Sequence, residues 1–188
     1  MKKTRHNFNR NCRIDMICNH DMFRMHQSFI FFKDGYAYAT NAHILVKVKI
    51  SEIANFQDEQ VEILEGKAVH RSVYAKLLPF ERVEITLEGF KARVPDADSF
   101  ITFGFATVEE KMVGDIEKVI ADAKKEEQTT ITTFGLNPVL LNSLNKIFND
   151  TYGVELIVKA ANKPVLIRWQ AKDAIGLIMP VMIHEDRW

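Results

Sequence analysis

From Phe29 to Ile50 the chain has the short apolar runs and the alternation of apolar and polar residues that are typical of β-strands. Three strands are predicted, over Phe29–Phe32, Tyr36–Thr40 and His43–Ile50. Asp34 and Gly35 predict a tight turn between the first two, because this dipeptide accepts the positive φ angles that a hairpin requires. In the third strand apolar residues occupy the even-numbered positions and mostly polar residues occupy the odd-numbered ones, so one side of that strand is expected to be buried.

A second unit follows an acidic stretch. Ser51–Glu65 predicts a surface connection, with a short strand or turn near Val61–Leu64. Beyond it the pattern predicts a strand, a helix and three strands, over Ala68–Val69, Arg71–Leu78, Arg82–Leu87, Phe90–Val94 and Phe100–Phe105.

Composition shifts sharply over residues 107–128, which are highly charged. Within them a helix is predicted over Asp115–Lys125, because Ile116, Val119 and Ile120 fall on one face at helical spacing. We therefore place the boundary between two lobes here.

A third unit repeats the order of the second. Its strand, helix and three strands are predicted over Thr130–Phe134, Pro138–Phe148, Val154–Lys159, Val165–Trp169 and Ile175–Ile183. Asn137 and Pro138 are typical of a helix start, since Asn caps free amides and Pro fits the first turn.

These units predict an α+β fold of antiparallel sheets with helices on one face, built from repeats of the β-α-β-β-β type. The division that follows is a flexible basic arm at 1–13, a first lobe at 14–108, a charged connecting segment at 109–128, and a second lobe at 129–188.

Composition indicates a chain with a core and no global charge. Of 188 residues 47% are hydrophobic, and 25 basic residues balance 25 acidic ones. The only cysteines, Cys12 and Cys18, favour reduced thiols in a cytosolic protein. The polar N-terminus and the lack of an apolar run of roughly 18 residues indicate a cytoplasmic protein, neither exported nor embedded in a membrane.

Residues for catalysis or for a cofactor do not form a recognisable set. His20 and His26 have no third ligand nearby, His184 lies beside acids near the end of the chain, and no nucleotide-binding or nucleophile-elbow motif occurs. We therefore expect no enzyme activity, no metal and no cofactor.

Two distant strings, Tyr36–Val46 and Gly176–Ile183, together resemble the two halves of one peptide-binding pocket. The first is similar to the strand-turn-strand sequence A-T-D-G-H-R-L-A of the bacterial DNA polymerase III beta subunit (DNA sliding clamp) family, with Asn41, Ala42 and Ile44 replacing Asp, Gly and Arg. The second is similar to that family's M-P-M-R-L, with Val181 and Met182 replacing Met and Arg. The resemblance implies that these strings lie side by side.

The resemblance extends from about Asp21 to Ile183 at low identity. Four further segments match in order, at Met22–Phe32, Val113–Ile120, Phe134–Leu144 and Lys163–Arg168. The family's N-terminal domain and one whole repeat before the last helix have no counterpart, so the resemblance is to a shortened clamp.

The resemblance implies a pocket for short linear motifs, whose apolar side chains enter a cleft between apolar walls. Its residues would be Thr40, Ala42, His43, Ile44, Leu45, Val119, Leu177, Met179, Pro180 and Val181. It also implies non-specific contact between helix cations and double-stranded DNA, which here points to Arg71, Lys76 and Lys146. The basic arm, with Lys2, Lys3, Arg5 and Arg10, is a further electrostatic candidate.

Three hypotheses follow. The first is a homo-oligomeric, clamp-like processivity factor that tethers DNA polymerase or other replication and repair proteins near DNA. The second is a clamp-derived regulator that binds the same peptides and does not encircle DNA. The third is a small α+β enzyme, which the lack of a polar constellation disfavours.

Overall fold

The computed structural model of the protein describes residues 7–19, 27–95, 97–106, 110–131, 133–151 and 153–182. Its strands are β1 (Phe29–Lys33), β2 (Tyr36–Thr40), β3 (Ile44–Lys49), β4 (Ala68–His70), β5 (Val83–Ile85), β6 (Gly89–Arg93), β7 (Phe100–Gly104), β8 (Val154–Ile157), β9 (Val165–Trp169) and β10 (Ala174–Ile178). Its helices are η1 (Ile14–Met16), α1 (Ile50–Ile53), α2 (Asp58–Ile63), α3 (Arg71–Leu77), α4 (Glu110–Lys125) and α5 (Pro138–Asn145).

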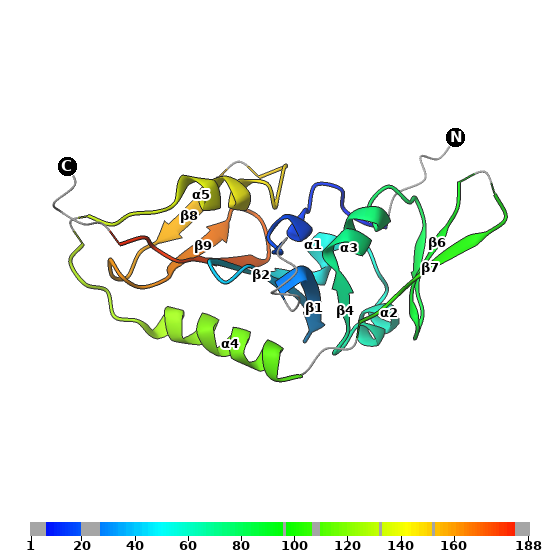
Figure 1. Cartoon of the computed structure of the whole chain (residues 1–188), viewed down its shortest axis with the longest axis horizontal. Helices are drawn as coiled ribbons and strands as arrows, with labels where there is room; N and C mark the ends of the chain where they lie inside the picture. The colour runs from blue at the N-terminus through cyan, green and yellow to red at the C-terminus, as the bar shows by residue number, and fades with distance from the viewer. Residues whose placement is uncertain are drawn as a thin grey trace.

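Within these described residues the strands form two antiparallel sheets (Figure 1). The main sheet has seven strands in the order β4-β1-β2-β3-β10-β9-β8, and the small sheet has the order β5-β6-β7. Every pairing is antiparallel. The predicted α+β class with antiparallel sheets is therefore confirmed. The main sheet joins strands from both expected lobes, through β3 and β10.

Helices cover both faces of the main sheet, so the expectation of helices on one face is wrong for α4. Figure 1 shows α3 and α5 on one side and α4 along the other. On the first side Tyr74 of α3 and Leu144 of α5 belong to a core that includes Val46 of β3. On the second side Ile120 of α4 packs in a separate cluster with Leu45. Neighbouring strand residues point to opposite faces, which is why both helical layers find apolar partners.

The expectation of a flexible arm is wrong for residues 7–13. Phe8 and Cys12 are buried, and Phe8 packs edge-to-face against Tyr74 at 5.7 Å between ring centroids. The Asn9 amide donates to the Ile53 carbonyl at 2.7 Å. The burial of these two apolar side chains fixes the segment, although five basic residues surround them in the sequence.

One predicted connection and one predicted strand also differ from the structure. Ser51–Glu65 contains α1 and α2, so Val61–Ile63 are helical where a short strand or turn was expected, and a turn begins only at Leu64. The α2 helix has acids in its first turn, and the Gln57 amide donates to Gln60 Oε1 at 3.2 Å, both of which stabilise a helix start. The described residues of Thr130–Phe134 form no strand, because β propensity needs a paired neighbour and Thr130, Thr133 and Phe134 are exposed.

Candidate functional site: an apolar cleft between the sheet and helix α4

The two strings that the sequence paired lie on adjacent strands. β10 and β3 pair in antiparallel register, with Leu177 opposite Leu45 and Ile178 opposite Ile44. The ladder continues past the end of β10, where the Met179 amide donates to the His43 carbonyl at 2.9 Å. The prediction that these distant segments fold side by side is confirmed.

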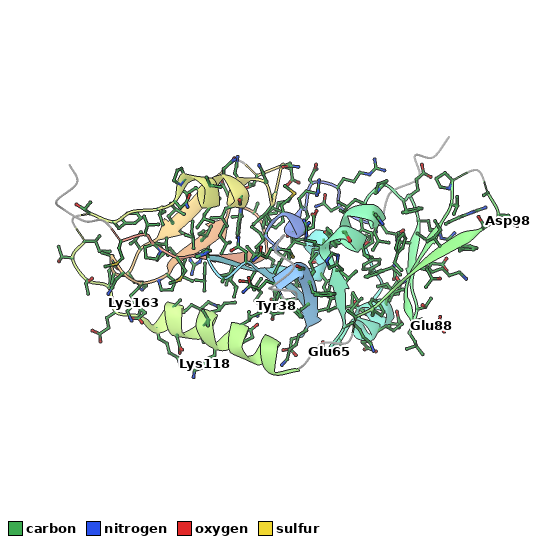
Figure 2. All side chains as sticks on the ribbon, viewed as in Figure 1. Tyr38, Glu65, Glu88, Asp98, Lys118 and Lys163 are labelled. Carbon is green, nitrogen blue, oxygen red and sulfur yellow. The ribbon has the colours of Figure 1, made fainter. Side chains whose placement is uncertain are left out.

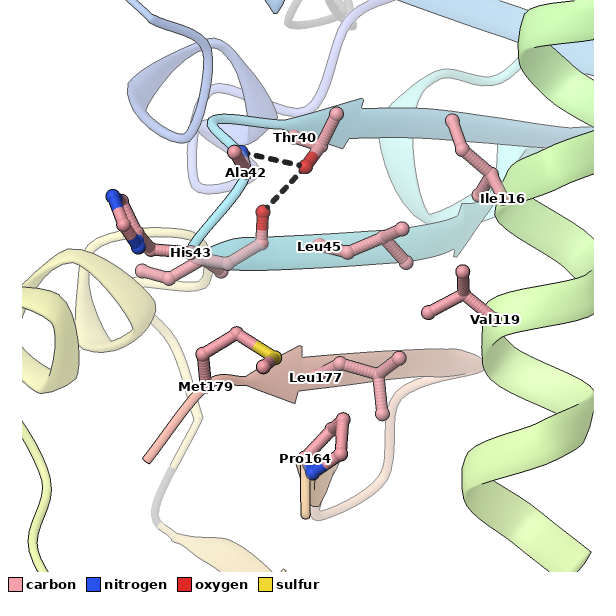
Figure 3. Close-up of a pocket in the computed structure, with 10 residues that line it drawn as sticks. Thr40, Ala42, His43, Leu45, Ile116, Val119, Pro164, Leu177 and Met179 are labelled. Atoms are coloured by element: carbon pink, nitrogen blue, oxygen red, sulfur yellow. Dashed lines mark hydrogen bonds between the residues drawn. The ribbon is translucent and has the colours of Figure 1, made fainter. Parts of the chain in front are cut away.

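Beside the seam, by which we mean the paired strands β3 and β10, an apolar cleft of about 210 Å³ opens toward α4 (Figure 3). Its lining comes from the β2–β3 hairpin, from β10 and the residue after it, from the residue before β9, and from α4. The lining residues are Thr40, Ala42, His43, Ile44, Leu45, Ile116, Val119, Pro164, Leu177 and Met179. Eight of the ten pocket residues expected from the sequence are thus together in the described part of the chain.

The other two expected residues lie just outside. Pro180 and Val181 follow Met179, and Val181 forms an isolated bridge with Gly135. Ile116 and Pro164 also line the cleft but were not among the residues expected from the sequence. Ile116 precedes Val119 by one helical turn on the apolar face already recognised, so helical spacing could have placed it in the site.

The hairpin that forms one rim of the cleft is held by its own side chains. Thr40 Oγ1 donates to the Ile44 carbonyl at 2.8 Å and accepts from the Ala42 amide at 3.1 Å (Figure 3). Asn41 Oδ1 accepts from the amides of His43 and Ile44 at 3.0 and 2.8 Å. Short polar side chains thereby replace the backbone bonds that a three-residue connection cannot make.

Ala42 has a φ of 74° in this hairpin, a left-handed conformation that glycine adopts more readily. Replacing Ala42 by glycine should raise the free energy of unfolding by about 0.5–1 kcal/mol, because relief of strain exceeds the entropy that glycine adds to the unfolded chain. Urea unfolding measures this change. Ala37→Gly in the middle of β2 is the control and should lower stability; a lower stability for Ala42→Gly as well would contradict the strain argument.

The lining of the cleft is apolar, and its described residues carry no acidic side chain and no Lys or Arg. A charged group entering the cleft would therefore lose water without gaining a partner. Leu45 and Leu177 are buried at its base, whereas Val119 and Met179 are 46% and 41% exposed. The volume lies below the roughly 300–1,000 Å³ of pockets that enclose small molecules, which suits a few apolar side chains of a longer ligand.

Of the residues expected to contact DNA, four lie in the described part of the chain. Lys76 on α3 and Lys146 after α5 are exposed, and Arg71 is half-buried at the start of α3. The guanidinium of Arg10 donates to the carbonyls of Leu78 and Pro79 at 3.0 and 2.8 Å, so it is already hydrogen-bonded within the protein. The other arm residues, Lys2, Lys3 and Arg5, lie outside the described residues.

Reactive groups are scarce in the described residues. Cys12 and Cys18 form no disulfide and are buried, and burial raises the pKa of each thiol to about 12, so neither is a thiolate at neutral pH.

No group of three His, Cys, Asp or Glu side chains in the described ranges is arranged to hold a metal ion. No described helix combines the length and apolar character needed to cross a bilayer. His20, His26 and His184 fall outside the described residues.

Comparison with known proteins places the fold. No protein-family model matches the chain, and no curated protein matches it in sequence. Solved sliding clamps match it in structure: the DNA polymerase III beta subunit of Thermotoga maritima has a TM-score of 0.57 at 11% identity, covering 92% of this chain and 61% of that one. A sliding clamp of Bartonella birtlesii bound to griselimycin has a TM-score of 0.55 at 13% identity, covering 91% and 64%.

The DNA polymerase sliding clamp of Pseudomonas aeruginosa gives the same result, with a TM-score of 0.52 at 12% identity over 91% of this chain and 63% of that one. The chain therefore has the fold of bacterial sliding clamps. It spans less than two thirds of the length of the clamps that it matches.

Proposed function

We propose that this protein, whose fold is that of bacterial sliding clamps, binds a short apolar peptide motif of replication or repair proteins in the cleft between β3, β10 and α4. It acts without catalysis, by holding its partner close to DNA in the cytoplasm. The observation that carries the proposal is the register of Leu45 against Leu177, which assembles both expected pocket walls beside an uncharged cleft. Binding of this kind raises the effective concentration of a partner.

Peptide binding is tested directly by fluorescence anisotropy. The probe is a fluorescein-labelled eight-residue peptide with two leucines and a phenylalanine at its centre and no charged side chain among its central five residues. We expect saturable binding that is lost when these three residues become serine, and competition by griselimycin, which is bound to the Bartonella clamp. Absence of binding by both probes would refute the proposal.

Assembly into a ring is part of the proposed tethering function. β8 and β7 end their sheets, and both carry exposed apolar residues, such as Val154 and Leu156 on β8 and Phe100 and Ile101 on β7. Exposed apolar edge strands favour pairing with another chain, and two different edges allow head-to-tail closure. Light scattering is expected to detect an oligomer. Lys76 on α3 and Lys146 directly after α5 are exposed, and they are the proposed contacts to phosphates.

A second candidate function rests on the balance of 25 basic and 25 acidic residues, which gives the chain no global positive field for DNA. A regulator could bind the same peptides without encircling DNA. The two functions separate on nicked circular DNA: a tether remains on the circle and is released by linearisation, whereas a regulator binds the peptide as a strict monomer and is not retained.

A further inference from the structure

The third wall of the cleft is a helix with a narrow apolar contact. Among the described side chains of α4, Ile116, Ile120 and Ala123 are buried against the main sheet, at spacings of four and three residues. Such a single stripe gives α4 little apolar area, because most of its other residues are charged. Polar contacts are therefore important for its position.

Glu117 of α4 supplies such a contact next to the cleft. Its carboxylate accepts a hydrogen bond from the Tyr38 hydroxyl and an ion-paired hydrogen bond from Lys47 Nζ at 2.6 Å. Tyr38 and Lys47 stand directly opposite each other on β2 and β3. Figure 2 shows Tyr38 between the sheet and α4.

The contact is continuous with the lining of the cleft. Lys47 follows Leu45 by two residues on the same strand, so both side chains project from the face that α4 covers. Glu117 lies between Ile116 and Val119, which line the cleft. A movement of Glu117 away from the sheet would move both lining residues with it.

Surrounding groups favour the charged form of Glu117 and the protonated form of Tyr38. Burial raises the pKa of Glu117, but hydrogen bonds from Lys47 and Tyr38 and nearby positive charge outweigh burial and hold the pKa below its ordinary value of 4.5. Burial, followed by the bond to Glu117, raises the pKa of Tyr38, so its hydroxyl remains a donor. Lys47 Nζ also lies 4.2 Å from the centroid of the Tyr36 ring, which restricts the ammonium group to this site.

A second polar contact lies one residue past the C-terminal end of α4. Lys163 Nζ donates to Glu126 at 2.7 Å, and Lys163 immediately precedes the cleft residue Pro164. Lys163 lies beside the C-terminal end of α4 in Figure 2, while Lys118 points away from the sheet. The contact of Glu117 lies beside the cleft-lining residues Ile116 and Val119, and the contact of Glu126 lies just beyond the C-terminal end of the helix.

We infer that Glu117 is a positioning residue that, through Tyr38 and Lys47, holds α4 against the main sheet as the third wall of the cleft. Formation of the cleft and docking of α4 are then one event, and an apolar peptide that fills the cleft also stabilises the docked helix. This inference rests on the proposed function for its ligand, but the docking of α4 can be tested without one.

The test compares Glu117→Ala with Asp122→Ala, a control that removes an exposed acid from the same helix. Without peptide, hydrogen exchange of the amides of residues 116–125 should accelerate about tenfold or more in Glu117→Ala, as expected for loss of hydrogen bonds to a charged group. It should change little in Asp122→Ala. Unchanged exchange in Glu117→Ala would overturn the inference, whether or not the peptide binds.

Tyr38→Phe provides a second variant that keeps the buried ring and removes the hydroxyl. It should accelerate exchange of α4 in the wild-type background and have no further effect when Glu117 is already alanine, because both changes break the same contact. Additive effects would contradict the inference.

Peptide affinity supplies the remaining measurement. Glu117→Ala should weaken binding of the leucine- and phenylalanine-containing peptide about tenfold, and saturating peptide should slow exchange of α4 in the wild type. Undiminished affinity in Glu117→Ala would overturn the inference. A wild type that binds no peptide would refute the proposed function while leaving the exchange test of α4 decisive.

Discussion

Replacing Val119 by aspartate should weaken binding of the leucine- and phenylalanine-containing peptide about a hundredfold, which corresponds to about 2.7 kcal/mol. Val119 is 46% exposed at the rim of the cleft, so a carboxylate is tolerated in the free protein. Once an apolar side chain enters the cleft, that carboxylate loses water and finds no cation among the lining residues. Anisotropy titration measures the loss.

Val139→Asp is the matched control for this prediction. Val139 is 69% exposed in the first turn of α5, where a negative charge is favoured by the helix dipole, and it does not line the cleft. Its peptide affinity should equal that of the wild type. Equal affinity of Val119→Asp and Val139→Asp would show that the peptide binds elsewhere.

Replacing Gly176 by valine should lower the free energy of unfolding by about 3 kcal/mol. Gly176 lies in β10, in the seam that joins the cleft walls, and the Trp169 indole covers it. A β-carbon at this position would lie 2.7 Å from Cη2 of Trp169 and 3.4 Å from Cβ of Ile167. The indole cannot retreat easily, because Trp169 is buried and packs edge-to-face on Phe148 at 5.5 Å.

Guanidinium unfolding tests this prediction, with Gly153→Ala as the control. At Gly153 an added β-carbon would meet its nearest neighbour, Gln170 Oε1, at 3.7 Å, which is ordinary contact. Stability should therefore change little there. If Gly176→Val had the same free energy of unfolding as Gly153→Ala, the claim that Trp169 packs tightly over β10 would be contradicted.

The first three strands could be predicted because local residues determine them. Asp34 and Gly35 both adopt positive φ, and the alternation in β3 matches its buried face. The seam between β3 and β10 is different, since it joins residues more than a hundred positions apart. Nothing in local periodicity specifies such a pairing, and it was predicted only through the resemblance to clamps.

The parts that were not predicted depend on tertiary contacts. The sequence predicted Phe8 as part of a flexible basic arm, but in the structure three aromatic side chains pack against it. Thr130–Phe134 has strand-forming residues, but they find no ladder in the described structure. The sequence does not distinguish Glu117 from the other acidic residues of its segment, because neither Tyr38 nor Lys47 is near it in sequence. Each case needs a partner that a linear pattern does not contain.

The most direct test of the central claim is a methyl-resolved NMR titration of the whole chain with the unlabelled form of the peptide. Binding in the cleft predicts that the largest shift changes occur at the methyl groups of Leu45, Val119, Leu177 and Met179, and that exposed Val139 and Val154 remain unchanged. Saturating peptide that shifts none of the four cleft methyl groups, or that shifts mainly Val139 or Val154, would contradict the account.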